Sequence, residues 1–114
     1  MVKNTTRRTT LSDNYRVLVS KWSQALGLML SLNKNKSMVF NFKDERRVAL
    51  HMLFVFYPID VLFLDASKKI VEIKEGFRPF TFYTSESDKI KYVVELPKNA
   101  INCSKTKLND KIEF

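Results

Sequence analysis

VALHMLFVFYPIDVLFLD, residues 48–65, is the most apolar stretch of the chain, and the rest of the sequence is interpreted around it. Residues 48–57 are apolar at almost every position, which is typical of a strand covered on both faces. Pro58 cannot donate to a sheet ladder, so it predicts a bend or the start of a second strand. His51 and Asp60 interrupt the apolar residues, and a buried polar group costs free energy unless it finds a partner. These two residues are therefore the first candidates for a functional site.

Apolar and polar residues alternate in several other segments, which predicts short strands with one buried face. These segments are residues 15–19, 38–42, 59–64, 69–74, 90–96 and 111–114. Asp65 predicts a turn over residues 65–68, because its side chain can cap backbone amides. The charged residues 43–47 are short enough for a hairpin connection into the central stretch. We expect breaks or loops at residues 76–79, 81–88 and 98–110.

A helix is predicted near the start of the chain. Trp22, Ala25, Leu26, Met29 and Leu30 fall at helical spacing and form one apolar stripe. Such a stripe is more typical of core packing than of a ligand site. The expected fold is mostly β with one or two short helices, in the α+β class.

The 114 residues are expected to form a small barrel-like domain with an antiparallel or mixed sheet, because closure hides exposed strand edges. Residues 1–12 are polar, rich in threonine and without apolar periodicity, so they predict a flexible basic arm. Residues 13–114 then form a single β-rich domain.

Positive charge is concentrated in the first third of the chain. The net charge is +8, and residues 1–36 contain seven basic residues against one acidic residue. Such a pattern is compatible with contact to nucleic acid or another anionic surface, but a basic solvated tail is the preferred interpretation, because no recognition motif accompanies the charge. The candidate nucleic-acid residues are Arg7, Arg8 and Lys21, together with Arg78 and Tyr83 in a cluster of aromatic residues that could stack on bases if exposed.

Composition narrows the location and the chemistry. Cys103 is the single cysteine, no charged and apolar leader is recognisable, and no apolar run reaches the roughly 20 residues of a spanning helix. We therefore expect a cytoplasmic protein without a membrane span. Two glycines cannot build a phosphate loop or a dinucleotide fingerprint, and one histidine with one distant cysteine does not predict zinc. No cofactor and no metal site are predicted.

The sequence resembles the DUF192 family, a set of small bacterial and archaeal domains without an established activity. The landmarks that carry the resemblance are Gly27-Leu28-Met29, Met38-Val39-Phe40, the segment 58–65, Tyr92-Val93-Val94-Glu95-Leu96-Pro97 and Leu108-Asn109-Asp110-Lys111-Ile112. His51-Met52 is similar to the archaeal branch. Two positions depart from the family pattern: apolar residues follow Met52 where many members have polar ones, and Asn109 replaces the usual glycine. The resemblance implies a compact β-rich fold and no particular substrate.

Four residues are candidates for binding: His51, Asp60, Glu95 and Met29. His51 titrates near neutral pH, and Asp60 and Glu95 are carboxylates within the segments that match the family. Each also has a structural interpretation: a core histidine, a carboxylate that satisfies the bend after Pro58, and an ion pair with a basic residue. The leading hypothesis is a non-enzymatic domain that binds a small ligand or a protein partner. The alternatives are a nucleic-acid-associated protein and a carboxylate- or metal-assisted hydrolase.

Overall fold

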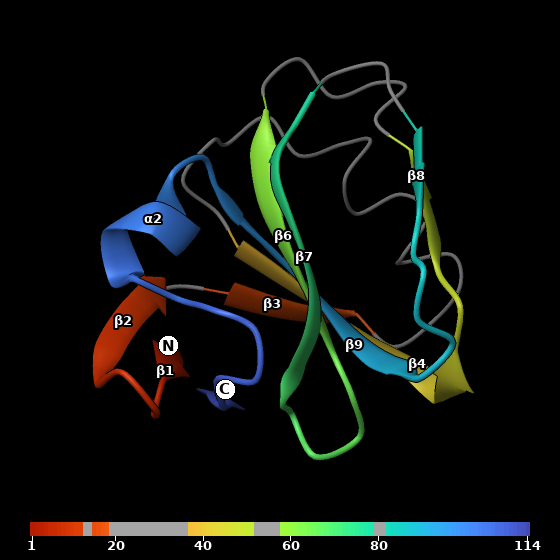
Figure 1. Ribbon diagram of the computed structural model, residues 1–114, viewed down its shortest axis with the longest axis horizontal. Helices are drawn as coiled ribbons and strands as arrows, with labels where there is room; N and C mark the ends of the chain where they lie inside the picture. The colour runs from red at the N-terminus through yellow and green to blue at the C-terminus, as the bar shows by residue number, and fades with distance from the viewer. Residues whose placement is uncertain (13–14, 19–36, 52–57, 79–81) are drawn as a thin grey trace.

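A five-stranded sheet in the order β3-β4-β9-β6-β7 forms the centre of the computed structural model (Figure 1). The structure describes residues 1–12, 15–18, 37–51, 58–78 and 82–114. The strands of this sheet are β3 (Tyr15–Leu18), β4 (Ser37–Arg46), β9 (Ile90–Pro97), β6 (Ile59–Leu64) and β7 (Ile70–Phe77). β3 pairs parallel to β4 and the other neighbours pair antiparallel, so the sheet is mixed.

Strand β6 is the most buried part of the described chain, with all six residues buried. Its side chains alternate between two hydrophobic clusters on opposite faces of the sheet, because successive residues of a strand point to opposite sides. We call the face that carries Leu62 and Leu64 the α2 face and the face that carries Val61 and Phe63 the β8 face. A strand covered on both faces explains why residues 59–64 are almost continuously apolar.

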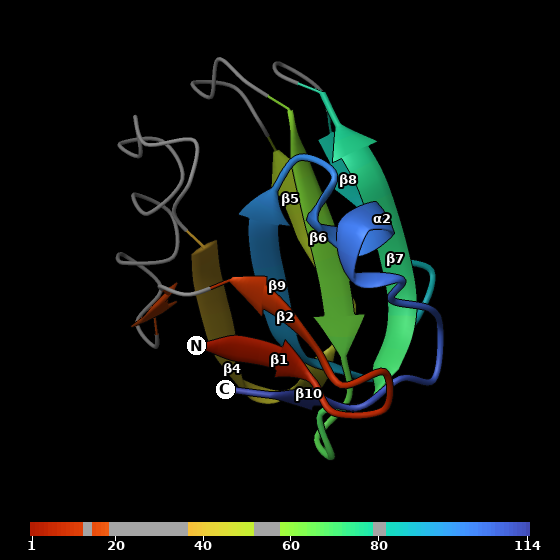
Figure 2. The same ribbon diagram turned by 90° about the vertical axis from the view of Figure 1, so that its left-hand side faces the viewer.

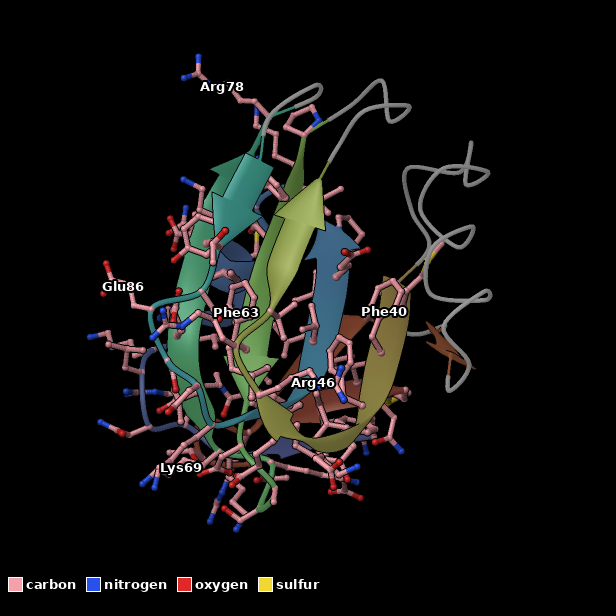
Figure 3. The ribbon with its side chains drawn as sticks, turned by 90° about the vertical axis from the view of Figure 1, so that its right-hand side faces the viewer. Phe40, Arg46, Phe63, Lys69, Arg78 and Glu86 are labelled. Atoms are coloured by element: carbon pink, nitrogen blue, oxygen red, sulfur yellow. The ribbon has the colours of Figure 1, made fainter. Side chains whose placement is uncertain are left out.

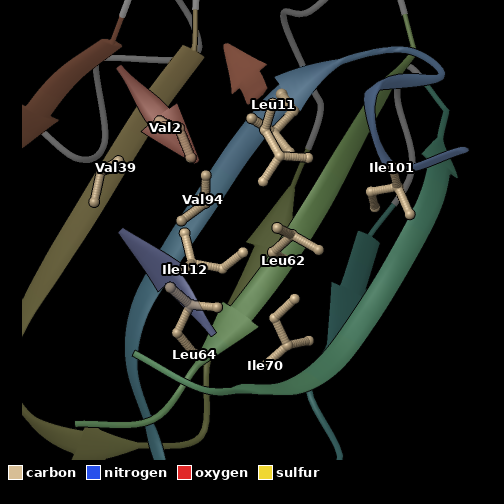
Figure 4. Packing of buried hydrophobic residues seen from close by; sticks show 10 residues of the cluster. Val2, Leu11, Val39, Leu62, Leu64, Ile70, Val94, Ile101 and Ile112 are labelled. Atoms are coloured by element: carbon tan, nitrogen blue, oxygen red, sulfur yellow. The ribbon is translucent and has the colours of Figure 1, made fainter. Parts of the chain in front are cut away.

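The α2 face is covered by a second sheet in the order β10-β1-β2 and by a short helix (Figure 2). These elements are β1 (Val2–Asn4), β2 (Thr9–Ser12), β10 (Ile112–Glu113) and α2 (Ala100–Ser104). Val2, Leu11 and Ile112 pack from this layer onto the central strands (Figure 4). The core of this half of the protein therefore combines residues from both ends of the sequence.

The prediction of a flexible arm at residues 1–12 was wrong, because this segment contributes two paired strands. Val2, Asn4 and Leu11 are buried among exposed polar residues. The apolar residues are too few to give a periodic pattern, and the buried Asn4 is satisfied by Thr106 and Asp110, more than 100 residues away in sequence. Sequence periodicity carries no signal of such a long-range hydrogen bond.

On the β8 face, β5 (Ala49–His51) pairs with β8 (Phe82–Thr84) as a separate two-stranded sheet. The expected hairpin at residues 43–47 is not formed: β4 continues through Arg46, and β5 pairs with β8 instead of returning along β4. The expected double-sided strand at residues 48–57 extends beyond β5 into positions that lie outside the described residues. The predicted helix over residues 22–30 also lies outside them.

Two predicted connections take a different form. The segment 98–110 contains helix α2, which is only five residues long and therefore shows no helical periodicity. β7 continues through the expected break at Gly76, where the pairing with β6 shifts register and the backbone has a φ of 58°. Glycine adopts this conformation at low cost, so Gly76 forms a bulge without ending the strand.

The turn predicted at residues 65–68 is confirmed. The Asp65 carboxylate accepts hydrogen bonds from the backbone amides of Ser67 and Lys69, both at 3.0 Å. Burial alone would raise the pKa of Asp65, but these hydrogen bonds and the positive charge of Lys69 hold it below its ordinary value. The mostly-β class with a short helix is also confirmed. The described strands form three sheets, none of which closes into a barrel.

Candidate functional site

Glu95 lies on the β8 face, in the middle of the central sheet. β9 places it directly beside Met38 of β4 on one side and Val61 of β6 on the other. Val93, Phe40 and Phe63 occupy the next positions on the same face, and all these neighbours belong to one hydrophobic cluster. Figure 3 shows Phe40 and Phe63 on this side of the molecule. The sheet therefore surrounds a single carboxyl group with apolar side chains.

The Glu95 carboxyl group is buried without compensation from the described residues. Its side chain is 2% exposed, and neither carboxyl oxygen has a hydrogen-bond partner in the described part of the chain. Burial raises the pKa of Glu95 well above its ordinary value, because the charged form loses its hydration. Burial therefore favours the neutral carboxylic acid, which has one O–H donor and acceptor positions.

Asp60 lies on the opposite face of the sheet from Glu95. It pairs with Leu96 across the β6–β9 ladder, while its neighbour Val61 pairs with Glu95. The Asp60 side chain is 3% exposed and accepts hydrogen bonds from the backbone amides of Gly76 at 3.0 Å and Ile101 at 3.1 Å. Asp60 thus joins the β7 bulge to helix α2. The two carboxyl groups do not share a site, and Asp60 has a structural role.

The other two predicted binding residues are placed less completely. The backbone of His51 lies in β5, which covers the β8 face and therefore the same side of the sheet as Glu95. The direction of its side chain is not among the described features, so a role beside Glu95 stays a prediction. Met29 lies outside the described residues, and its predicted role is likewise untested.

Among the described residues predicted to bind nucleic acid, Arg7 and Arg8 lie together, whereas Arg78 and Tyr83 lie elsewhere. Arg7 and Arg8 lie in the turn between β1 and β2, whereas Arg78 projects outward beyond the end of β7 (Figures 1 and 3). Lys21 lies outside the described residues. Tyr83 is half-buried against the rings of Phe63 and Phe77, and therefore contributes to the core of the β8 face instead of forming an open stacking surface.

Glu72, a carboxylate beside Tyr83, has a structural role. The Tyr83 hydroxyl donates to Glu72, which also accepts from the backbone amides of Glu86 and Ser87. Burial, the hydrogen bond to Glu72 and the nearby negative charges of Glu72 and Glu86 raise the pKa of Tyr83 to about 12. Glu72 therefore fixes the loop between β8 and β9, and its acceptor positions are used within the protein.

Asp110 is the centre of a polar network that the sequence did not reveal. One of its oxygens, Oδ2, accepts from Asn4 Nδ2 at 2.9 Å, Arg7 Nε at 3.0 Å and the Lys107 amide at 2.9 Å. Burial would raise the pKa of Asp110, but hydrogen bonds from Asn4, Arg7 and Lys107 and the charge of Arg7 hold it below its ordinary value. The family-like segment 108–112 singled out this residue, but not its partners.

Two further features can be stated for the described part of the chain. No group of three or more histidine, cysteine, aspartate or glutamate side chains is arranged to hold a metal ion there. No helix there has both the length and the apolar character needed to cross a membrane.

Fold and site together define a small, mostly-β protein whose mixed central sheet buries a carboxyl group that has no hydrogen-bond partner among the described residues. The chain belongs to the DUF192 family, whose description is "uncharacterized ACR", and the match covers residues 2–114. It is 31% identical to a UPF0127 protein of Thermococcus sibiricus over all of this chain and 74% of that protein. It is 27% identical to a UPF0127 protein of Pyrococcus horikoshii, over all of this chain and 98% of that protein. The predicted family and its archaeal relatives are confirmed.

Solved structures show the same fold. A candidate transcription regulator from Sinorhizobium meliloti 1021 superposes with a TM-score of 0.79 and 24% identity, covering 87% of this chain and 79% of the other. A protein of unknown function from Novosphingobium aromaticivorans gives a TM-score of 0.77 and 20% identity, covering 88% of this chain and 74% of the other. At these identities the likeness extends to the fold and not to the activity.

Proposed function

We propose that this protein is a non-enzymatic binding domain, and that the Glu95 carboxyl group is the polar anchor for a small, mostly apolar ligand on the β8 face. The observation that carries the proposal is the fully buried Glu95 carboxyl, which has no hydrogen-bond partner among the described residues. Leaving such a group unsatisfied costs about 1–3 kcal/mol. A ligand that satisfies it would recover this free energy on binding.

The chemistry of the anchor indicates the kind of ligand. A neutral carboxylic acid both donates and accepts a hydrogen bond, so it is complementary to a group that does the same, such as an amide. The surrounding Met38, Val61 and Phe63 side chains favour an apolar body on that group. Binding a charged amine would require an ion pair to be buried, which is costly in such surroundings.

The hydrolase alternative finds less support. Two-carboxylate catalysis requires both acids in one cleft, but Asp60 lies on the other face and its carboxylate already binds two backbone amides. A cytoplasmic location stays part of the proposal. It is supported by Cys103, the only cysteine of the sequence, which is an exposed free thiol of the kind that persists in a reducing compartment.

A matched ligand series tests the proposal. Hexanamide, hexanol and hexylamine would be titrated into isotope-labelled protein while amide and methyl NMR signals are recorded. We expect hexanamide to shift the methyl signals of Met38 and Val61 most strongly. We expect Glu95→Leu to weaken hexanamide binding by about tenfold, which corresponds to one lost hydrogen-bonding group of about 1.4 kcal/mol.

Glu113→Gln provides the control, since Glu113 is an exposed glutamate on β10. It should bind hexanamide like the wild type. Equal affinity of the wild type and Glu95→Leu for all three compounds would contradict the anchoring role of Glu95. The absence of any shift at millimolar hexanamide would contradict small-ligand binding of this class.

A further inference from the structure

A basic surface lies on the α2 side of the molecule, away from Glu95. It comprises two adjoining grooves of about 510 Å³ and 340 Å³ that both include Thr9 in their linings. Arg7, Lys105 and Lys107 line the larger groove, and Lys3 and Arg8 line the smaller one. We call these five residues the basic track. Glu75 is the one acidic residue in the two linings.

The fold brings the basic track together from two distant segments. Arg7 and Arg8 belong to the β1–β2 turn, while Lys105 and Lys107 follow helix α2 (Figure 2). The Thr9 hydroxyl donates to the Ser104 carbonyl at 2.9 Å and connects the two segments. The track is therefore a consequence of the tertiary structure, and the charge of the first third of the sequence reveals only part of it.

Arg7 is held in position for binding an anion. Its backbone amide donates to Asn4 Oδ1 at 3.0 Å and its Nε donates to Asp110 Oδ2 at 3.0 Å, while 39% of the side chain remains exposed. Its terminal Nη atoms make no hydrogen bond within the described part of the chain. A guanidinium group fixed at one nitrogen and open at the other two suits bidentate contact with a phosphate group.

Two other cations of the basic track occupy unusual backbone positions. Arg8 and Lys105 are exposed and have φ angles of 57° and 58°, a conformation that glycine adopts at lower cost. Lys105 lines the larger groove and Arg8 lines the smaller one. Neither residue has an ion-pair partner within 4.0 Å in the described structure.

We propose that the basic track binds the phosphate backbone of duplex nucleic acid without sequence selectivity. A succession of cations across two grooves matches a repeating polyanion better than a single small anion. The linings contain no aromatic side chain, so they offer no stacking surface for the bases of a single strand. Phosphate contacts without base contacts give affinity but no sequence specificity.

Fluorescence anisotropy with a labelled 20-base-pair DNA duplex tests this proposal. Five cations, partly offset by Glu75, predict that log Kobs falls with log salt concentration with a slope of about −4. Neutralising Lys105 with Lys105→Gln should make the slope shallower by about 1 and weaken binding by about threefold to tenfold at low salt. Circular dichroism melts of each variant confirm that it remains folded.

Lys89→Gln is the matched control. Lys89 is an exposed lysine that lies outside both grooves, in the connection between β8 and β9. It should change affinity by less than about twofold, because it makes none of the proposed phosphate contacts. An equal effect of Lys105→Gln and Lys89→Gln would overturn the proposed site in favour of general charge attraction. Tighter binding to a dT20 single strand, or binding to anionic lipid vesicles without DNA binding, would overturn the proposed partner.

Discussion

Replacing Glu95 with methionine should stabilise the protein. Methionine has a similar length and places no polar atom among Met38, Val61 and the other apolar neighbours. The change removes a buried carboxyl group that has no partner among the described residues, so we expect a gain of about 1–3 kcal/mol in the free energy of unfolding. For a chain of 114 residues, this gain corresponds to a rise in Tm of about 4 °C per kcal/mol.

The free energy of unfolding gained through Glu95→Met should increase with pH. Burial raises the pKa of Glu95 in the folded protein above the ordinary value of 4.5. Between 4.5 and the raised value, the folded protein keeps the proton while the unfolded chain has lost it. The unfolded state then binds fewer protons, so wild-type stability falls by up to about 1.4 kcal/mol per pH unit in this window. Glu95→Met lacks this slope, and its advantage should be larger at pH 7 than at pH 4.

Urea denaturation of both proteins at pH 4, 5, 6 and 7 measures the effect. Glu113→Met is the control, because Glu113 is exposed and its replacement should change the stability by no more than about 0.5 kcal/mol. A destabilisation by Glu95→Met at all four pH values would refute the reasoning, because it would mean that the carboxyl group is well satisfied in the folded protein. A gain that does not change with pH would refute the raised pKa alone.

Three further substitutions test the packing and the polar network. Leu11→Ala should lower the free energy of thermal or urea unfolding by about 2–4 kcal/mol, because Leu11 is buried in the hydrophobic cluster on the α2 face. The control Thr10→Ala, at an exposed position, should lower it by less than about 0.5 kcal/mol, and equal effects would contradict a structured N-terminal segment. Gly76→Ala should cost only about 1 kcal/mol by the same measurement, because the added Cβ meets no atom within 4 Å and only the positive φ is unfavourable; a loss above about 3 kcal/mol would reveal a steric clash. Asp110→Asn should cost about 2 kcal/mol at pH 7. The pKa of Asp110 is lowered from 3.8 in the folded protein, so its contribution to stability is present above pH 3.8 and is lost as the pH falls through the lowered value. In urea titrations the stability difference between the wild type and the variant should therefore shrink below pH 3. A constant difference would exclude a role for the charge.

The strands of the central sheet were predictable because the apolar residues that become buried lie close together in the sequence. Residues 59–64 are apolar on both faces, and the Asp65 turn follows from side-chain chemistry within four residues. The N-terminal strands were not predictable, since Asn4 is buried only because Thr106 and Asp110 satisfy it. Local patterns report local structure, and this segment is stabilised by residues from the other end of the sequence.

The placement of the candidate site residues was also predictable only in part, because it depends on pairing between distant strands. Glu95 was a candidate because it is a carboxylate within a segment that matches the family, and the structure buries it; its role in binding stays a prediction. Its grouping with Asp60 failed because a ladder register decides which face each residue occupies. Val61 pairs with Glu95, and a one-residue offset moves Asp60 to the opposite face. Both strands can be recognised in the sequence, but their register cannot be predicted from it.

The pairing of β1 with β10 sets the order in which the protein can be completed during synthesis. Lys3 pairs with Glu113, so β1 leaves the ribosome about 110 residues before its partner exists. Closing a loop of this length costs about 4 kcal/mol of chain entropy before any contact compensates for it. Val2 and Leu11 therefore lack Ile112, a member of the same hydrophobic cluster, until translation has passed residue 112. We expect this layer to assemble last and to limit the rate at which the whole fold forms.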